Sequence, residues 1–287
     1  MKRADDGGMT RPVWFITGSS TGLGRALAEA VLAHGDRVVA TARDPSTLDD
    51  LTGSHPDDIV RLRLDVTDPT QVIAAVEEAV RRTGAIDVLV NNAGHGLIGA
   101  LEELSDEQVR AVLDTNVLGV LSVTRAVLPH MRVRRSGHIV QMSSVGGVVG
   151  NPGHALYAMS KFALEGMSEA LAGEVAPLGI RVTIVEPGPF RTDFAGRSMR
   201  FADAIDDYRD TPAGRLRERF SDQNGVQPGD PTRAAAAIIR AVRDENAPLR
   251  LPLGSDAVRR IREKLQGQLA DLDTWESVAV ATGYPAT

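Results

Sequence analysis

Three side chains near the middle of the sequence have the types and spacing needed to move a proton and to stabilise charge. Tyr157 and Lys161 are four residues apart in a helical pattern, so both can point into one site. A free tyrosine, with a pKa of about 10, holds its proton too tightly near neutrality, and a nearby cation lowers that pKa. Ser144 ends the preceding apolar strand, and its hydroxyl can bond a substrate oxygen and stabilise charge that forms there.

Alone, the tyrosine–lysine pair is a weak signal, and a chance surface pair is its default interpretation. Together with Ser144, it predicts hydride chemistry at a carbonyl or an alcohol, in which Tyr157 is the acid and base. Ser144 is preferred to its neighbour Ser143 because of its spacing from Tyr157. His95 and His154 are close to these residues in the sequence and are candidates for lining the same pocket.

A glycine-rich turn joins the first apolar strand to the first helical pattern. Strand Val13–Thr17 runs into Gly18, Gly22 and Gly24, and a helix follows at once. Glycines allow a tight turn and a close approach to a pyrophosphate, whose charge the free N–H groups of the helix can hold. A glycine cluster alone indicates only a turn, whereas its place between strand and helix favours dinucleotide binding.

The residues after the second strand bear on which dinucleotide binds. A carboxylate there would accept hydrogen bonds from both ribose hydroxyls, but the matching residue is Ala42. Arg43 follows, and a guanidinium suits a 2′-phosphate. We therefore expect NADP(H) to be preferred to NAD(H). The alternative is a surface Arg43 paired with Asp44, a pairing that would spoil the phosphate site.

These features resemble the short-chain dehydrogenase/reductase family, whose opening motif T-G-x-x-x-G-x-G matches Thr17–Gly24. The resemblance extends from Val13 to Pro252, nearly the whole chain. The other matching motifs follow in the family's order, and they are Asp65-Val66, Asn91-Asn92-Ala93-Gly94, Ser144 with Tyr157-x-x-x-Lys161, and Pro187-Gly188-x-x-x-Thr192.

The resemblance implies four catalytic residues, Asn116, Ser144, Tyr157 and Lys161. Lys161 would also hold the nicotinamide ribose, and Asn116 would kink its helix and hold a water in a proton relay. A local hydrogen bond to the helix backbone is a structural alternative for Asn116, compatible with that role. The implied cofactor contacts are Gly18, Ser20, Thr21, Gly22, Leu23, Gly24, Arg43, Asp65, Val66, Asn92, Ala93, Gly94, Tyr157, Lys161, Pro187, Gly188 and Thr192.

The long segment 189–229, with the T-A-R and E-P-G-P stretches, resembles the steroid and retinoid branch of the family. The expected function is an NADP(H)-dependent oxidoreductase acting on a small-molecule substrate that is a carbonyl or a secondary alcohol. Two alternatives stay open. One is a catalytically silent dinucleotide-sensing or partner-binding protein. The other is a 3-oxoacyl-thioester reductase, which would need a basic patch for an acidic carrier.

Short apolar runs alternate with longer helical patterns along the chain. Near-continuous Val, Ile and Leu runs are typical of strands buried on both faces of a parallel sheet. The alternation predicts an α/β fold with one Rossmann-type, doubly wound sheet of seven strands and helices on both faces. The runs are Val13–Thr17, Arg37–Thr41, Ile59–Leu64, Ile86–Val90, His138–Met142, Ile180–Val185 and Arg250–Pro252, and the helical patterns are Leu23–His34, Pro69–Thr83, Ser105–Arg132, Ala155–Ala176 and Pro231–Asp244.

The expected organisation has three parts. Residues 1–11 are polar and predict a disordered tail, and residues 12–253 form the catalytic domain with the substrate loop 189–229. Residues 254–287 predict a helical extension built from two helices, 255–272 and 274–281.

Composition excludes several classes of function. The chain has no cysteine, which excludes disulfides, thiolate metal sites and a cysteine nucleophile, and no metal site is expected. A net charge of −6 without a basic run argues against nucleic acid as the main ligand. No signal peptide or membrane span is expected, so we predict a cytoplasmic protein. Family habit predicts a homodimer or homotetramer.

Overall fold

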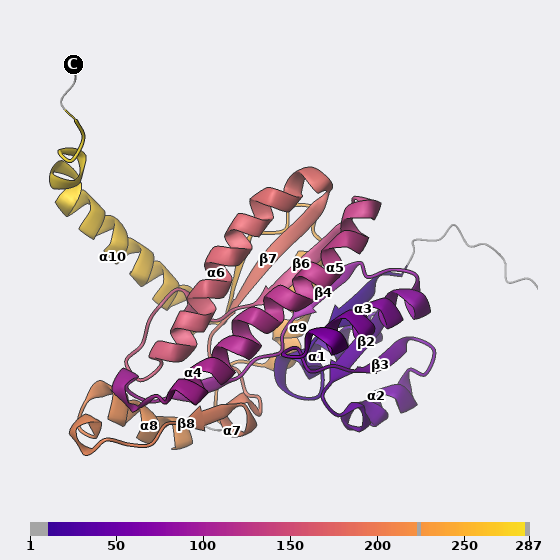
Figure 1. The fold of residues 1–287 in the computed structure, drawn as a ribbon, viewed down its shortest axis with the longest axis horizontal. Coiled ribbons are helices and arrows are strands. Elements are labelled where there is room, and N and C mark those ends of the chain that lie inside the picture. Colours follow the sequence, from indigo (N-terminus) through magenta and orange to yellow (C-terminus); the bar gives the residue numbers. More distant parts are fainter. Residues whose placement is uncertain (1–10, 223–224, 285–287) are drawn as a thin grey trace, which may run out of the picture.

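The computed structural model describes residues 11–222 and 225–284. Its centre is a parallel sheet of seven strands in the order β3-β2-β1-β4-β6-β7-β9, which confirms the predicted doubly wound fold (Figure 1). The strands are β1 (Val13–Ile16), β2 (Arg37–Ala42), β3 (Ile59–Arg63), β4 (Val88–Asn91), β6 (Gly137–Met142), β7 (Ile180–Pro187) and β9 (Arg250–Leu253). Strand order reverses between β1 and β4, and the crevice beyond the carboxyl ends at such a reversal is where ligands bind in α/β sheets.

Alternate residues of the central strands pack into two separate cores. In β1, Trp14 and Ile16 belong to the core beneath α1 and α9, whereas Val13 and Phe15 belong to the core beneath α3, α5 and α6. β1 is therefore buried on both faces, as its continuous apolar sequence predicts, whereas the edge strands β3 and β9 are partly exposed. The covering helices are α1 (Gly22–Ala33), α3 (Pro69–Thr83), α5 (Val120–Arg134), α6 (Ala155–Val175) and α9 (Pro231–Arg243), and a short α2 (Asp49–Ser54) lies at the edge.

The predicted helix 105–132 has an irregular centre. It consists of α4 (Asp106–Leu113), a π-helical turn Asp114–Gly119, and α5. A capping box at Ser105 starts it, because the Ser105 hydroxyl accepts a hydrogen bond from Gln108 N at 3.2 Å. The turn widens the helix where Asn116 points inward, as π-turns often do at functional sites.

The stretch Asp106–Arg134 also meets the length and composition criteria for a membrane span, with a mean hydropathy of 1.4 over 18 residues. The sequence analysis did not anticipate this. Its buried side packs against α3 and the sheet, and core helices of non-membrane proteins pass the same test. The observation therefore assigns no membrane role.

The long segment after β7 is more structured than its sequence suggested. It contains α7 (Phe194–Arg197), β8 (Met199–Phe201) and α8 (Pro212–Asp222). β8 pairs in parallel with β5 (Gly96–Ile98), which follows the turn after β4, and neither short strand was predicted. This small sheet joins the substrate loop to the cofactor side of the fold.

The chain ends in one long helix, α10 (Ser255–Val280). The sequence analysis predicted two helices with a break near residue 273, and this was wrong. Asp273 and Thr274 disfavour a helix only weakly. Residues 268–280 contain no proline or glycine that would end the helix near this point. At the other end, residues 1–10 of the predicted tail lie outside the described residues, whereas Arg11 pairs with Asp58 at 2.9 Å.

Candidate active site

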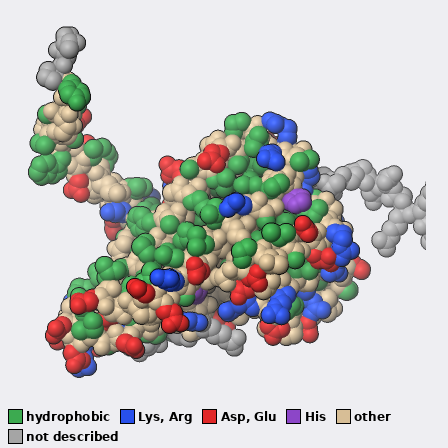
Figure 2. All heavy atoms as spheres, viewed as in Figure 1, with side chains coloured by type: hydrophobic (Ala, Val, Ile, Leu, Met, Phe, Trp, Pro, Cys, Tyr) green, Lys and Arg blue, Asp and Glu red, His purple; other side chains and the backbone are tan. Residues whose placement is uncertain are grey.

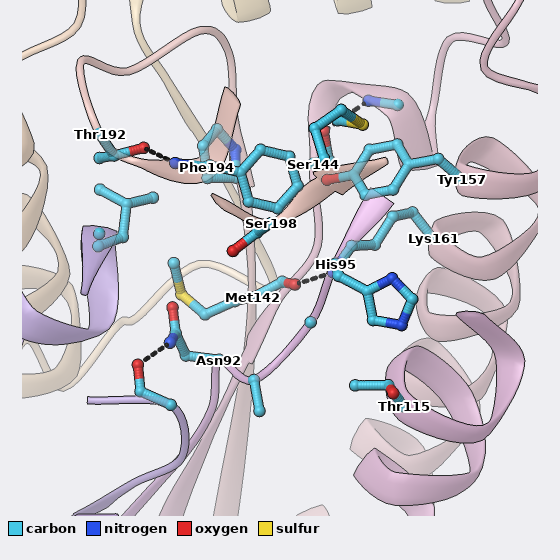
Figure 3. A pocket seen from close by; sticks show the side chains of 18 of the residues that line it. Asn92, His95, Thr115, Met142, Ser144, Tyr157, Lys161, Thr192, Phe194 and Ser198 are labelled. Atoms are coloured by element: carbon cyan, nitrogen blue, oxygen red, sulfur yellow. Dashed lines mark hydrogen bonds between the residues drawn. The ribbon is translucent and has the colours of Figure 1, made fainter. Parts of the chain in front are cut away.

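A cavity of about 1030 Å³ opens at the carboxyl ends of the strands. All the predicted site residues line it except Gly24 and Asn116, which lie directly behind its wall. Figure 3 shows Tyr157, Ser144 and Lys161 at one end of this cavity and Asn92 and Thr192 further along it. The fold therefore brings the separate motifs of the sequence into one site.

The glycine-rich turn is held in place by the turn after β4. Thr17 Oγ1 accepts hydrogen bonds from the N–H groups of Asn92 and Ala93, each at 2.9 Å. The Asn92 amide in turn donates to the carbonyl oxygens of Thr17 and Gly18, at 2.9 and 3.0 Å. The Thr17 hydroxyl was not among the predicted site residues, although it opens the quoted motif.

The same turn explains why glycines occupy it. Gly18 and Gly22 have φ values of +67° and +64°, which other residues rarely adopt. A Cβ on Gly24 would lie 2.3 Å from the Asn92 amide nitrogen and 2.4 Å from the Gly18 oxygen. The first turn of α1 carries no acidic residue, and the side chain of its N-cap residue Thr21 makes no capping hydrogen bond, so the first N–H groups of the helix face the cavity without a competing anion. This cradle fits a diphosphate.

Arg43 is exposed at the rim of the cavity and has no ion pair among the described residues. The alternative pairing with Asp44 does not occur, because the Asp44 carboxylate accepts hydrogen bonds from Ser46 N at 3.0 Å and Ser46 Oγ at 2.8 Å. These bonds lower the pKa of Asp44 below its ordinary value. Arg63, beside Ala42 in the sheet, adds a second positive charge near this edge.

Tyr157 is buried at the cavity wall, and Ser144 faces it (Figure 3). Burial raises the pKa of Tyr157, and hydrogen bonding to Ser144 acts in the opposite direction. From the sequence alone, Lys161 is expected to lower this pKa. In the structure the Lys161 ammonium lies 5.8 Å from the centre of the phenol ring and donates to the Met142 carbonyl at 2.7 Å. The net direction for Tyr157 in the chain without a bound dinucleotide is upward, and burial is its main cause.

Lys161 itself is buried, and burial lowers its pKa to about 8. An amine with this pKa is still mostly protonated at pH 7, so the ammonium charge is present beside the phenol under neutral conditions. The Met142 carbonyl fixes its position at the end of β6. This geometry suits a positive charge that is held ready for a phenolate.

Asn116 is fully buried in the π-helical turn and joins two parts of the site. Its Oδ1 accepts from His95 N at 3.0 Å, and its Nδ2 donates to His95 O at 2.8 Å and to Ser160 Oγ at 3.0 Å. Ser160 Oγ donates in turn to the Tyr157 carbonyl at 2.8 Å. Asn116 thus positions the helix that carries Tyr157, and its amide bonds neither its own helix backbone nor Lys161.

Aromatic side chains surround Tyr157 on the side away from Lys161. The ring centres of His154 and Phe194 lie 6.0 and 5.9 Å from that of Tyr157, and Phe220 lies 5.8 Å from His154. Burial lowers the pKa of His154 to about 4, so its ring is neutral at pH 7. His95 and His154 both line the cavity. Phe194 and Phe220 were not singled out from the sequence, which gives no sign that their loop folds back over Tyr157.

A buried charge cluster behind Lys161 was also missed. Arg250 Nε lies 3.2 Å from Glu165 Oε2 and 3.5 Å from Glu186 Oε1. Burial and the neighbouring Glu165 raise the pKa of Glu186 to about 7, and burial also raises the pKa of Glu165. Two signals were present in the sequence: Glu165 is four residues after Lys161, and Glu186 interrupts an apolar strand.

Comparison with known proteins agrees with this geometry. The family model for the short chain dehydrogenases matches residues 12–202. An oxidoreductase of Botryotinia fuckeliana is 40% identical over 271 residues, which cover 94% of this chain and 98% of that protein. Retinol dehydrogenase 8 of Bos taurus is 38% identical, with 82% of this chain and 79% of that protein covered.

A solved structure gives the same result. The crystal structure of a short-chain dehydrogenase from Streptomyces avermitilis is 43% identical and has a TM-score of 0.91, covering 96% of this chain and all of that one. The resemblance noted from the sequence is confirmed, including its steroid and retinoid side. The chain therefore belongs to the short-chain dehydrogenase family, whose members are oxidoreductases.

Proposed function

We propose that this chain is an NADP(H)-dependent oxidoreductase that acts on a bulky, apolar carbonyl or secondary alcohol, with Tyr157 as the acid and base. One observation carries the proposal: Tyr157, Ser144 and Lys161 share a single cavity with the glycine-rich turn. Retention of all three side chains argues against a catalytically silent binding protein. Family membership supports the general reaction, hydride exchange between a nicotinamide dinucleotide and a carbonyl or alcohol.

The turn after β1 and the start of α1 would hold the diphosphate, and Arg43 would face the adenosine ribose. Pro187, Gly188 and Thr192 would contact the nicotinamide end, beside Tyr157. When bound, the dinucleotide supplies the hydride or accepts it. The cradle formed by Gly22 and the uncapped first turn of α1 supports this placement.

The chain's own residues manage the proton. In the direction of reduction, the Tyr157 hydroxyl donates its proton to the substrate oxygen, to which the Ser144 hydroxyl also donates a hydrogen bond. Lys161 stabilises the phenolate that remains, because its ammonium lies 5.8 Å from the ring centre. Asn116 keeps the helix in register through Ser160.

Replacing Tyr157 with Phe tests the catalytic role. We expect carbonyl reduction to fall by at least about 100-fold, the lower range for loss of a general acid. Binding of NADPH, followed by fluorescence titration, should change little because the ring remains. Turnover at the wild-type rate would refute the role of Tyr157.

Arg43→Ala tests the choice of dinucleotide. A hydrogen-bonded guanidinium–phosphate contact contributes about 1.5–3 kcal/mol, so we expect kcat/KM with NADPH to fall by about tenfold or more, with no loss for NADH. Arg82→Ala, on the exposed side of α3, is the matched control. Equal losses with both dinucleotides would overturn the NADP preference.

We also propose a cytoplasmic homodimer or homotetramer that pairs through α5 and α6. Leu118, Leu121, Met159 and Phe162 are exposed on this face, where Figure 2 shows apolar side chains over a broad area. Such patches on a folded domain are typical of association surfaces. Sedimentation of Phe162→Glu compared with the wild-type chain tests this, and an unchanged mass would refute it.

A further inference from the structure

The helix α10 has two parts with different surroundings. Its first turns pack on the domain, where Ala257 and Ile261 form a small core with Val145. Arg260 Nη2 donates to Asn151 Oδ1 at 2.6 Å, which fixes the base of the helix beside the cavity. From Arg262 to Val280 every residue is exposed, and this part projects from the body of the molecule (Figure 1). We call residues 262–280 the arm.

The arm carries an apolar stripe that nothing in the described chain covers. Leu265, Leu269, Leu272 and Trp275 follow Ile261 at steps of three or four residues, so they share one face of the helix. Each of the four is more than half exposed. Figure 2 shows the resulting apolar side chains along the arm. Helices in proteins take most of their stability from packing such a face, so the arm requires a partner.

The charges on α10 divide at its centre. From Ser255 to Gly267 there are four Arg and Lys residues and two Asp and Glu residues, whereas from Gln268 to Val280 there are three acidic residues and no basic one. The helix dipole favours the opposite arrangement, with acids near the start and bases near the end. Arg262, Lys264 and all the acidic residues of the second half form no ion pair among the described residues, so the pattern does not serve the single chain.

The division of charge specifies the partner. If a second copy of α10 lies antiparallel to the first, each basic half faces an acidic half, and the dipoles also oppose one another favourably. A parallel pair would place like charges together. An anionic membrane would be repelled by the acidic half.

We propose that α10 is a dimerisation arm that pairs antiparallel with α10 of a second copy of this chain, with the two-fold axis beside Gln268, where the basic half meets the acidic half. This interface is separate from the α5 and α6 face and does not depend on the proposed enzyme activity. Because the pairing is two-fold, the same residues serve both copies.

The absence of cysteine from the chain allows a direct test. Gln268→Cys places a thiol on the stripe beside the proposed axis, so mild oxidation should join most chains into a covalent dimer. Ala279→Cys lies on the same face near the far end, about 17 Å along the helix from the axis at 1.5 Å per residue, so two copies cannot meet there. Glu77→Cys, exposed on α3, measures random collision.

A charge reversal identifies the contacts. In the Gln268→Cys background, Asp271→Lys with Asp273→Lys should lower the cross-linked yield several-fold, and so should Arg262→Glu with Lys264→Glu. All four changes together should restore it. Carbonyl reduction should be unchanged throughout, because these residues lie outside the cavity.

Three results would overturn the proposal. The first is a Gln268→Cys yield no higher than that of Glu77→Cys. The second is efficient cross-linking of Ala279→Cys, which would indicate a parallel pair. The third is an uncross-linked chain that sediments with lipid vesicles, which would make the stripe a membrane surface instead.

Discussion

The two ends of the cavity are built in different ways. At the cofactor end, the turns after β1 and β4 are tied by hydrogen bonds between Thr17, Gly18 and Asn92, all between 2.9 and 3.0 Å long. At the substrate end, His154 and Phe194 contact the ring of Tyr157, and Phe220 contacts that of His154, with ring centres about 6 Å apart. Directional bonds fix one geometry, whereas apolar contacts tolerate several. A substitution at the cofactor end should therefore abolish dinucleotide binding, whereas a substitution at the substrate end should change which substrates fit.

The largest effect is expected at Gly24. In Gly24→Ala the new methyl would lie 2.4 Å from the Gly18 carbonyl oxygen, which belongs to the backbone and cannot turn aside. The turn must shift, so we expect NADPH affinity to fall by about 100-fold or more, and stability by about 1–3 kcal/mol, as for other overpacked sites.

Gly173→Ala is the matched control, because Gly173 is also inside a helix and no chain atom lies within 4 Å of its Cβ position. It should stabilise the chain by about 0.5–1 kcal/mol and leave NADPH binding unchanged. Titration with NADPH and thermal unfolding measure both variants. Equal effects of the two substitutions would remove the distinction between the ends of the cavity.

An intermediate effect is expected from Glu186→Gln. The folded chain raises the pKa of Glu186 from 4.5 to about 7, so between these pH values it keeps a proton that the unfolded chain has lost. This carboxyl therefore lowers the free energy of unfolding as pH rises through that window. Glutamine does not titrate, so the variant lacks this pH dependence. Its free energy of unfolding relative to that of the wild type should therefore rise by roughly 3 kcal/mol from pH 4.5 to above pH 7.

Urea unfolding at pH 5 and pH 8 measures this difference. Glu169→Gln is the control, because Glu169 contacts the same Arg250 but is mainly exposed. If the free energies of unfolding of Glu186→Gln and the wild type differ by the same amount at both pH values, the raised pKa of Glu186 is contradicted. That result would leave the hydrogen bonds of the cofactor end unaffected.

The smallest effect is expected at Phe220. Phe220→Ala removes part of the aromatic wall without touching Tyr157, so KM for a bulky apolar carbonyl should rise about tenfold while kcat stays within a factor of about two. A small ketone should show no change. A fall in kcat for both substrates would mean that the substrate end also aligns the reacting groups.

The sequence allowed much of the cofactor end to be predicted. The glycine spacing and the pair Tyr157 and Lys161 are set by a local turn and by helix periodicity, and both leave a local pattern, whereas Asn92 was identified through the family resemblance. The seven main strands were also predictable, because the central ones are near-continuous apolar runs and even the edge strands β3 and β9 keep apolar residues between their arginines and the next turn. The three-residue strands β5 and β8 were not, since a run of that length has no period to detect.

Other features depend on contacts between distant residues. Glu165, Glu186 and Arg250 come from three different elements, and only the fold shows that they meet. The residue pair Tyr157 and Lys161 shows the cation beside the phenol but not the extent of burial, which raises the pKa of Tyr157. The aromatic wall likewise depends on how the segment after β7 folds back over the sheet.

The pairing of β5 with β8 has a consequence for how substrates enter and leave. Gly96 N donates to Ser198 O at 2.8 Å, and Ala202 N donates to Ile98 O at 2.9 Å. The substrate loop 189–229 is therefore bound to the rest of the domain at its middle as well as at its two ends. A movement of the whole substrate loop as one body would have to break these hydrogen bonds between β5 and β8. We therefore expect two short flaps, one on each side of residues 199–201, to open independently. The flap with Phe194 would then control access to the nicotinamide end of the cavity. The flap with Phe220 would control the outer entrance for the substrate.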